Sequence, residues 1–180
     1  VELHTQKLLL AERLVLNIMQ HMSGIATTTN KYVRLIEGLH TRLLDTRKTT
    51  PGMRLLDKMA VKIGGAVNHR IGLFDMIMLK DNHVDFAGGI TQAIDRAQDY
   101  LKSTGRNLKI EIEVRNMEEL ETVLNHGGVD RVMLDNFDIP TTRKAVERIK
   151  GTVETESSGG ITIETLRSYA ETGVDFISVG

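Results

Sequence analysis

The sequence contains no cysteine and only two prolines among its 180 residues. Without cysteine, the chain forms neither disulfides nor thiolate zinc sites, and no cysteine nucleophile acts in catalysis. A chain of this kind suits a reducing compartment, so we expect a cytoplasmic protein. No apolar run approaches the length of a membrane span, and the first residues do not resemble a signal peptide. We therefore expect no membrane as a partner.

Aromatic residues and net charge are scarce as well. Aromatics make up 4% of the residues, and the formal net charge is -1. Such a chain offers few rings for stacking bases and no overall attraction for a phosphate backbone, which argues against nucleic acid as a partner. Any binding of anions must then depend on local clusters of basic residues. The length itself corresponds to about one domain with a core of its own.

The first forty residues have the pattern of a helical segment. Apolar residues recur at spacings of three and four from Leu8 to Met22, which predicts one amphipathic helix. The stretch that follows the small residues Ser23 and Gly24 predicts a second helix. Because the chain lacks a starting methionine and begins inside this pattern, we expect it to be part of a longer protein. Residues 1–40 are interpreted as a helical segment that leads into the main domain.

From residue 41 onward, short runs typical of strands alternate with helical segments, most of which close in glycine. The runs are "RLLD", "MIMLK", "KIEIEV", "RVMLD", "TVETE" and "DFISVG". This alternation predicts βαβ units and a parallel sheet in one α/β domain over residues 41–180. Both a barrel and a doubly wound sheet fit the pattern. In either fold, functional residues collect at the carboxyl ends of the strands.

Polar residues follow almost every predicted strand, including the additional run "AVNHR". They include Asp45, Arg47, Lys48, His69, Arg70, Lys80, Asp135 and Glu156. Because the carboxyl ends of parallel strands meet at one edge of the sheet, these side chains are expected to form one ring of charge. A plainer explanation exists for single motifs. Asp45, Arg47 and Lys48 fit a solvated loop equally well. A neighbouring histidine and arginine, such as His69 and Arg70, often only pair with a carboxylate.

Two acidic positions are harder to explain as ordinary surface. Glu111 and Glu113 alternate with isoleucines in "EIEV", so both side chains point to the same side of the strand. A buried carboxylate needs a cation, a metal ion or hydrogen-bond donors, and Asp135 after "VML" raises the same requirement. Two carboxylates without a neighbouring histidine suit a hard ion such as magnesium better than zinc. We therefore predict Glu113 and Asp135 as magnesium ligands.

The segment "SSGG", residues 157–160, predicts a phosphate site. Glycine lets backbone amides approach an anion at a helix N-terminus, although glycine clusters also form plain turns. Phosphate sites of barrels often lie in the loops after the last two strands, here "SSGG" and the segment after "SVG". The cluster of basic residues requires a balancing anion, and arginine binds planar carboxylates through two hydrogen bonds. These features indicate a small substrate with more than one carboxylate and a pyrophosphorylated co-substrate. No residue is an evident nucleophile, so positioning and electrostatics are expected to drive the chemistry.

Eight motifs, in the order in which they occur, resemble the quinolinate phosphoribosyltransferase family, the carboxylating nicotinate-nucleotide pyrophosphorylases. They are "HMSGIATTT", "LLDTRKTTPGMR", "GGAVNHRIGLFD", "MLKDNH", "EIEV", "MLDN", "ESSGGI" and "YAETGVDFISVG". The resemblance covers essentially the whole chain. It implies an open, seven-stranded, TIM-like α/β barrel of parallel strands, preceded by the long helical segment. It also implies a homodimer or a hexamer of dimers, and an N-terminal sandwich domain and a C-terminal end that this chain lacks.

The resemblance further implies an activity and a set of residues. The reaction converts quinolinate and phosphoribosyl pyrophosphate into nicotinate mononucleotide, pyrophosphate and carbon dioxide in NAD biosynthesis, and it requires Mg2+. Catalytic roles are implied for Lys48, Lys80, Glu113 and Asp135, of which the last two also hold the metal. Substrate-binding roles are implied for Arg13 (toward a neighbouring subunit), Arg47, Lys48, His69, Arg70, Lys80, Glu113, Asp135, Ser158, Gly159, Gly160 and Gly180.

Three alternatives stay open at this point. A nicotinate phosphoribosyltransferase or a molybdenum-locus paralogue of the same fold shares much of the pattern. The full set of basic residues favours a dicarboxylate, because a monocarboxylate would leave a cation uncompensated. A non-catalytic anion-binding or assembly module is a third possibility, and it would need neither Glu113 nor Asp135 to be functional.

Overall fold

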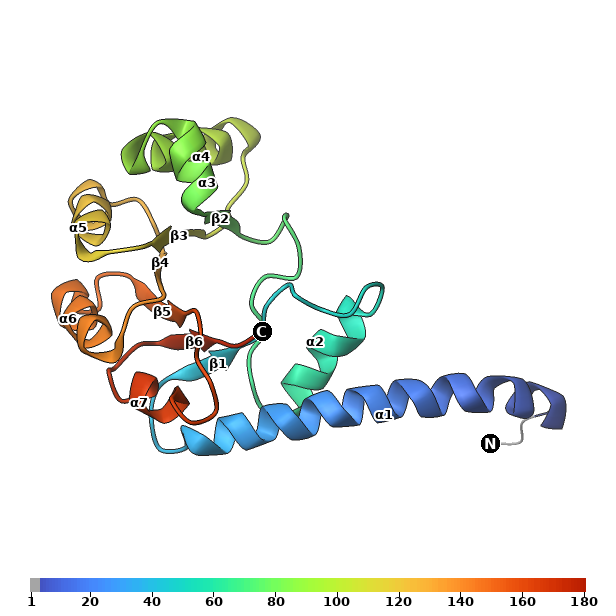
Figure 1. Ribbon diagram of the computed structural model, residues 1–180. Coiled ribbons are helices and arrows are strands. Elements are labelled where there is room, and N and C mark those ends of the chain that lie inside the picture. Colours follow the sequence, from blue (N-terminus) through green and yellow to red (C-terminus); the bar gives the residue numbers. More distant parts are fainter. Residues whose placement is uncertain (1–3) are drawn as a thin grey trace.

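A 31-residue helix, α1 (Thr5–Leu35), begins the computed structural model, which describes residues 4–180. Its first half is exposed and extends beyond the rest of the molecule (Figure 1). The prediction of two separate helices is wrong, because α1 continues through Ser23 and Gly24. A glycine inside a helix costs only about 1 kcal/mol relative to alanine. Packing of α1 against α2 (Arg54–Ile63) offsets that cost.

Specific contacts fix α1 on α2. His21 Nε2 lies 2.6 Å from Asp57 Oδ1, and Asp57 Oδ2 accepts a hydrogen bond of 2.9 Å from the backbone N–H of Thr50. Asp57 therefore links the long helix to the loop that follows the first strand.

Six parallel strands form one sheet in the order β1-β6-β5-β4-β3-β2. The strands are β1 (Arg42–Leu44), β2 (Ile77–Leu79), β3 (Ile110–Val114), β4 (Arg131–Asp135), β5 (Glu154–Ser158) and β6 (Phe176–Ser178). They lie in an arc, and the connecting helices cover its outer side (Figure 1). These helices are α3 (Asp81–Ala87), α4 (Ile90–Thr104), α5 (Met117–His126), α6 (Ile139–Ile149) and α7 (Leu166–Ala170). The predicted α/β fold with a parallel sheet is confirmed.

The run "AVNHR" forms no strand and only a single bridge, between Val67 and Leu44. Val67 donates to Leu43 O at 2.9 Å and accepts from Asp45 N at 3.3 Å. The next backbone donor, His69 N–H, points to the Asp45 carboxylate at 2.7 Å instead of to a strand. Because a side chain takes this donor, the ladder does not continue, and β1 and β2 remain the edge strands of an open sheet.

The two faces of the sheet differ completely in chemistry. Side chains of the outer face, such as Ile112, Val132, Leu134 and Ile177, are fully buried beneath the helices and form the hydrophobic core. Strand side chains alternate, so every second residue points to the inner face of the arc. The inner face carries Met78, Glu111, Glu113, Arg131, Met133, Asp135, Glu156, Ser158, Phe176 and Ser178.

Helix boundaries follow local rules with two exceptions. Pro140 lies in the first turn of α6, where Asp138 caps the helix by accepting from Thr141 N at 2.8 Å. Pro51 instead occupies the turn that precedes α2. The end of α6 is the second exception, since Lys150 and not a glycine adopts the left-handed conformation there, with φ 50°.

None of the helices within residues 4–180 combines the length and the apolar character that crossing a membrane requires.

Candidate functional site

A pocket of about 680 Å³ opens at the carboxyl ends of the strands. Each site residue predicted from the sequence lines it, with the exception of Arg13. The predicted residues found there are Arg47, Lys48, His69, Arg70, Lys80, Glu113, Asp135, Ser158, Gly159, Gly160 and Gly180. The carboxyl ends of the six strands, the loops that follow them and the "AVNHR" segment supply these residues, which agrees with the expectation of one ring of charge at this edge.

Asp45 organises one wall of the pocket. Its buried carboxylate accepts hydrogen bonds from Lys58 Nζ at 2.6 Å, Asn68 Nδ2 at 2.7 Å and His69 N at 2.7 Å. Lys58 Nζ also donates to the carbonyl oxygen of His69 at 3.1 Å. These contacts attach the "NHR" segment to the end of β1. Asp45 belongs to the ring of charge, but its carboxylate is already hydrogen-bonded to these residues, so its role is structural.

Three cations of the pocket have no carboxylate partner within residues 4–180: Arg47, Lys48 and Arg70. Arg47 Nε is buried and lacks any hydrogen-bond partner there. One nitrogen of Arg70 contacts only the sulfur of Met78, at 3.3 Å. Burial, together with the nearby positive charge of Arg47, lowers the pKa of Arg70 below its ordinary value. The two guanidinium groups are half-buried and repel each other, and an anion bound between them would compensate this repulsion.

Carboxylates stand on the opposite side of the pocket. Glu113 Oε2 lies 3.0 Å from Lys80 Nζ, and the Glu113 side chain is largely buried while that of Lys80 is 43% exposed. Asp135, on the neighbouring strand, accepts from Asn136 Nδ2 at 2.7 Å. Both carboxylates line the pocket and offer oxygen atoms as metal ligands. This donor set is the kind that magnesium prefers, completed by water or phosphate oxygens.

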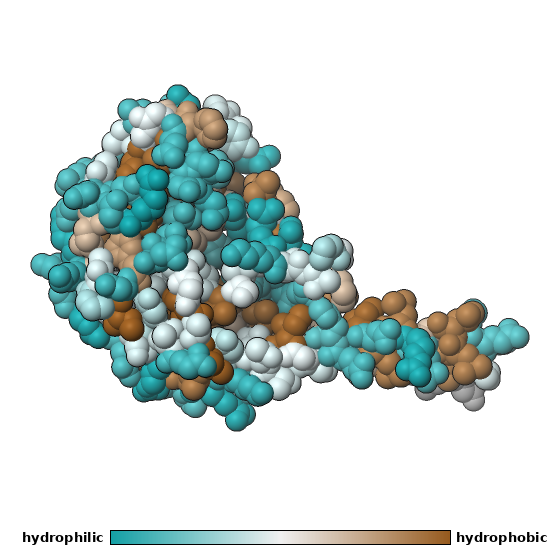
Figure 2. All heavy atoms as spheres, in the orientation of Figure 1, coloured by the Kyte–Doolittle hydropathy of each residue, from teal (hydrophilic) through white to brown (hydrophobic). Residues whose placement is uncertain are grey.

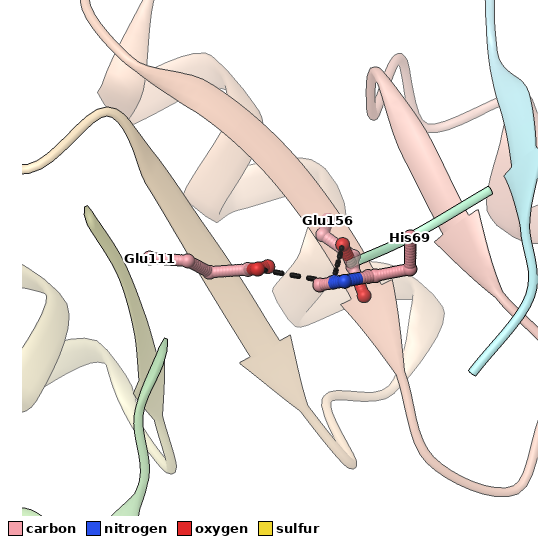
Figure 3. Close-up of side chains that lie close together, drawn as sticks. All are labelled: His69, Glu111 and Glu156. Carbon is pink, nitrogen blue, oxygen red and sulfur yellow. Dashed lines mark ion pairs between the residues drawn. The ribbon is translucent and has the colours of Figure 1, made fainter. Parts of the chain in front are cut away.

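A buried cluster lies beneath the pocket, between β3 and β5 (Figure 3). His69 Nε2 is 3.0 Å from Glu111 Oε2 and 3.3 Å from Glu156 Oε2, and both glutamates are completely buried. The N–H direction is not aligned with either oxygen, so the contact is an ion pair shared between two carboxylates and not a regular hydrogen bond. Within the described part of the chain, these three residues are also the group whose ligand atoms lie close enough to share one metal ion.

Opposing effects act on the protonation of His69. Burial disfavours the charged ring, but the adjacent carboxylates of Glu111 and Glu156 outweigh it and raise the pKa of His69 to about 9. In contrast, Nδ1 accepts the N–H of Arg70 at 2.7 Å, which favours a neutral ring with its proton on Nε2. A charged ring would carry a second proton on Nδ1, facing the N–H of Arg70, so this contact opposes the effect of the two carboxylates. In both states the proton on Nε2 faces the glutamates.

Burial also acts on the two glutamates, with different results. Burial raises the pKa of Glu111 above its usual range, and the adjacent Glu156 carboxylate adds to this effect. Burial opposes ionisation of Glu156 as well, but its contacts with His69 keep its pKa below the usual value. Arg131 NH1 donates to Glu156 Oε2 at 3.2 Å, and the same guanidinium packs over the Phe176 ring at 4.0 Å from its centroid. Glu156 is thus fixed from two sides.

The glycine loop after β5 reaches the pocket but does not open into a helix. Gly159 has φ 94°, and a Cβ there would overlap the side chain of Asn136, so only glycine fits. The next helix, α7, begins at Leu166 and has five residues. The expected helix N-terminus at "SSGG" is therefore wrong. The backbone of the loop lines the pocket together with Gly180, which lies beside Thr46 and Lys48.

Some pocket residues were not predicted from the sequence, and one predicted residue, Arg13, lies outside the pocket. Arg13 lies on the exposed half of α1 and is not among the pocket residues of its own chain. Met78 and Met133 also line the pocket, although their sequence context assigns them no role there. Glu156 was visible as a strand end, but its contact with His69 was not. Alternation with the buried Thr155 and Ser157 is the signal that places Glu156 on the inner face.

Comparisons with known proteins agree on one family. The family model described as "Quinolinate phosphoribosyl transferase, C-terminal domain" matches residues 25–180. A chloroplastic nicotinate-nucleotide pyrophosphorylase [carboxylating] of Arabidopsis thaliana is 44% identical over 98% of this chain and 54% of its own length. A probable nicotinate-nucleotide pyrophosphorylase [carboxylating] of Bacillus subtilis is 43% identical over 99% and 61%.

Solved structures give the same result. The nicotinate-nucleotide pyrophosphorylase from Francisella tularensis superposes with a TM-score of 0.89 at 48% identity, covering 96% of this chain and 60% of that one. The chain thus spans between about half and three fifths of the length of these relatives. With the matched family model and the shared fold, the chain belongs to the quinolinate phosphoribosyltransferase family.

Proposed function

We propose that this chain carries the active site of a carboxylating nicotinate-nucleotide pyrophosphorylase, a pentosyltransferase of NAD biosynthesis. The reaction joins quinolinate to phosphoribosyl pyrophosphate and releases nicotinate mononucleotide, pyrophosphate and carbon dioxide. The observation that carries the proposal is the group of unpaired cations Arg47, Lys48 and Arg70 in one half-buried pocket, across from Glu113 and Asp135. The relatives named for this activity support it.

Quinolinate carries two adjacent carboxylates on a pyridine ring, and the basic side of the pocket matches it. Arg47 and Arg70 offer planar guanidinium groups for two-point contacts. His69 and Lys80 complete the ring around the substrate, and Lys48 lies where it contacts both quinolinate and a phosphate group. A monocarboxylate would leave at least one of these cations without compensation, which favours quinolinate over nicotinate.

The opposite side of the pocket suits the co-substrate. Ser158, Gly159, Gly160 and Gly180 present hydroxyl and backbone groups for the 5′-phosphate, since their glycines let an anion approach the main chain. Glu113 and Asp135 would hold Mg2+ through carboxylate oxygens, with pyrophosphate oxygens as further ligands. Magnesium held there would supply positive charge beside the pyrophosphate leaving group. The side chain of Lys80, the present partner of Glu113, is 43% exposed, so it has room to turn toward quinolinate.

The chemistry requires positioning more than covalent catalysis. The pyridine nitrogen bonds to C1 of the ribose as the bond from C1 to pyrophosphate breaks, through a transition state with positive charge on the ribose. Glu113 and Asp135 stabilise that charge electrostatically. The product pyridinium accepts the electron pair that remains when the 2-carboxylate leaves as carbon dioxide, and a proton then replaces it. Lys48 or Lys80 stabilises the negative charge at this stage.

We propose a homodimer, or a hexamer of dimers, as the active assembly. The exposed half of α1 carries Leu8, Leu9, Leu10, Leu14, Val15, Leu16 and Met19, and Figure 2 shows apolar residues along this projecting arm. Exposed apolar surface of this extent marks an interaction site. Arg13 lies in the same stretch, so a partner's pocket is a reasonable destination for its charge. In this arrangement the exposed half of α1 forms the contact arm and residues 41–180 form the open barrel, with the segment at Val67 in the seventh-strand position.

The cytoplasm is the proposed compartment, on the ground that a cysteine-free chain suits reducing conditions. The chloroplastic Arabidopsis relative shows that family members also work in organelles. Microscopy of the tagged full-length protein tests the location.

Turnover by the full-length protein tests the proposed function. Quinolinate, phosphoribosyl pyrophosphate and Mg2+ should give nicotinate mononucleotide and carbon dioxide in equal amounts, and omission of Mg2+ should abolish both. Turnover of nicotinate without carbon dioxide would identify a nicotinate phosphoribosyltransferase. Binding of both anions without turnover would identify a non-catalytic anion-binding module.

A further inference from the structure

We propose that Glu111 and Glu156 are positioning residues that hold the imidazole of His69, and through its Nδ1 the backbone of Arg70, in place for a substrate carboxylate. The inference rests on the proposed function, because it assigns a purpose to the buried cluster beneath the same pocket. Neither glutamate is among the residues assigned above to substrate or metal. Glu111 does not line the pocket, so it acts through the histidine and not on the substrate.

Contacts at several atoms fix the His69 ring. Its backbone N–H is held by Asp45 at 2.7 Å, its Nδ1 by Arg70 N at 2.7 Å, and its Nε2 by Glu111 and Glu156. The side chain is 5% exposed. Lys48 and Lys80, in contrast, have exposed or half-exposed chains that can adopt several rotamers. His69 is therefore the rigid member of the basic group, and its contact with the backbone N–H of Arg70 limits the entropy that the Arg70 segment loses when a ligand binds.

The pair of glutamates is itself supported from below. Arg131 donates to Glu156 at 3.2 Å and to Glu154 at 3.0 Å, and its guanidinium lies over Phe176. This support fixes Glu156, which in turn orients His69. Arg131 and the Nε2 side of His69 thus compensate the glutamates of the cluster, while Arg47 and Arg70 have no carboxylate partner within residues 4–180 and are left for the substrate.

Unused hydrogen-bonding capacity argues against a purely structural role. Both oxygens of Glu111 and one of Glu156 are buried without an aligned donor in residues 4–180. A structural ion pair gains stability by satisfying such atoms, and an unsatisfied buried carboxylate is costly. Hydrogen bonds of active sites are often misaligned before the substrate binds and tighten in the complex. The cluster fits that behaviour.

A metal ion is the competing occupant, since the three ligand atoms lie within 4.8 Å of one another. The surroundings of the Glu156 oxygen that faces His69 argue against a metal ion. Oε2 of Glu156 is the atom near His69 Nε2 and also the atom to which Arg131 donates. A dication between His69 and that oxygen would lie close to the guanidinium charge. A proton on Nε2 avoids this repulsion, and for this reason the inference assigns the cluster to positioning.

Steady-state kinetics of the full-length protein test the proposal, with Glu111→Gln, Glu156→Gln and His69→Asn as variants. Each glutamine keeps the side-chain shape but removes the charge. We expect the KM for quinolinate to rise about tenfold in each glutamine variant, which equals about 1.4 kcal/mol, while the KM for phosphoribosyl pyrophosphate changes less than about twofold. Glu154→Gln is the matched control, because Glu154 shares Arg131 but does not touch His69. Its KM for quinolinate should stay at the wild-type value.

A double-mutant cycle separates positioning from general damage to the fold. If Glu111 and Glu156 act through His69, adding either glutamine to His69→Asn causes no further rise in the KM for quinolinate. Thermal melting of each variant confirms that it is folded. Should Glu111→Gln fail to fold, Glu156→Gln and its cycle with His69→Asn give the same test.

Each contrary result identifies what has failed. Absence of quinolinate turnover by the wild type would overturn the proposed function, and the inference with it. Normal wild-type turnover with unchanged quinolinate KM in both glutamine variants would overturn the inference alone. Equal rises in both KM values, or effects that add in the cycle, would indicate a structural role. Zn2+ bound in a one-to-one ratio by the wild type and lost in His69→Asn would assign the cluster to a metal.

Discussion

The outer and inner faces of the sheet are built from the same strands, yet they follow opposite rules. On the outer face, residues such as Leu134 are fully buried and bring no polar group that needs a partner. On the inner face, buried charges are tolerated because each one meets another charge or the pocket. Successive side chains of one strand therefore serve different purposes. Those of the outer face stabilise the fold, and those of the inner face form the binding pocket. Variants of one face should change melting, and variants of the other should change binding.

On the outer face, Leu134→Ala is expected to cause the largest loss of stability. Removing a fully buried leucine should lower the free energy of unfolding by about 2–5 kcal/mol, from lost burial and a new cavity. Below its melting temperature, the variant should bind quinolinate like the wild type, because Leu134 points away from the pocket. Chemical denaturation and calorimetry measure the two effects. A large loss of affinity in a folded variant would show that the faces are coupled.

On the inner face, Arg70→Ala is expected to cause the corresponding loss of affinity for quinolinate. The loss of charge-assisted hydrogen bonds should weaken quinolinate binding by about 1.5–3 kcal/mol, roughly ten- to more than a hundredfold. Stability should change little or rise, since Arg70 is half-buried beside Arg47 without a carboxylate partner. Arg96→Ala, an exposed cation on α4, is the control. Equal binding by the two variants would remove Arg70 from the substrate site.

His69 should make the stability of the inner face depend on pH. Its pKa is raised from 6.5 to about 9 in the folded state by Glu111 and Glu156, with Arg131 as the nearby cation. A raised pKa stabilises the fold fully below pH 6.5, and this contribution disappears as the pH rises through about 9. Melting temperatures of the wild type should therefore fall more steeply over this range than those of His69→Asn. Parallel profiles would indicate that the ring is neutral, as the contact with Arg70 N–H favours.

Asn116→Ala is expected to have the smallest effect and belongs to the outer layer. Asn116 caps α5 by accepting from Glu119 N at 2.9 Å, and loss of such a cap costs about 0.5–2 kcal/mol. Melting should show this modest loss, and calorimetry should show unchanged affinity for quinolinate. Reduced affinity would mean that α5 helps to shape the pocket.

The two faces also differ in how far the sequence predicts them. Strands such as "RVMLD" combine apolar runs with a polar end, so both the strand and the pocket position of Asp135 follow from local rules. The continuity of α1 does not, because Ser23 and Gly24 weaken the local pattern and tertiary packing on α2 decides. The same holds for the missing seventh strand, where the Asp45 side chain takes the N–H of His69.

Partners across the inner face are the least predictable part. Lys58 and Asp45 are thirteen residues apart, and His69 and Glu111 meet only because the sheet brings β3 to the "AVNHR" segment. Residue types and alternation indicate that Glu111 needs a partner, but not which one. The glycine loop shows the same limit, since "SSGG" predicts a phosphate site and a helix, and the structure has the loop at the pocket without the helix.

The central claim is that the unpaired cations of the inner face exist for a dicarboxylate. Calorimetric titration of the full-length protein with quinolinate, with nicotinate as the comparator at the same pH and salt, tests it most directly. The account predicts clearly tighter binding of quinolinate, by about tenfold or more for the additional charge-assisted contacts. Equal affinity for the two ligands would contradict it.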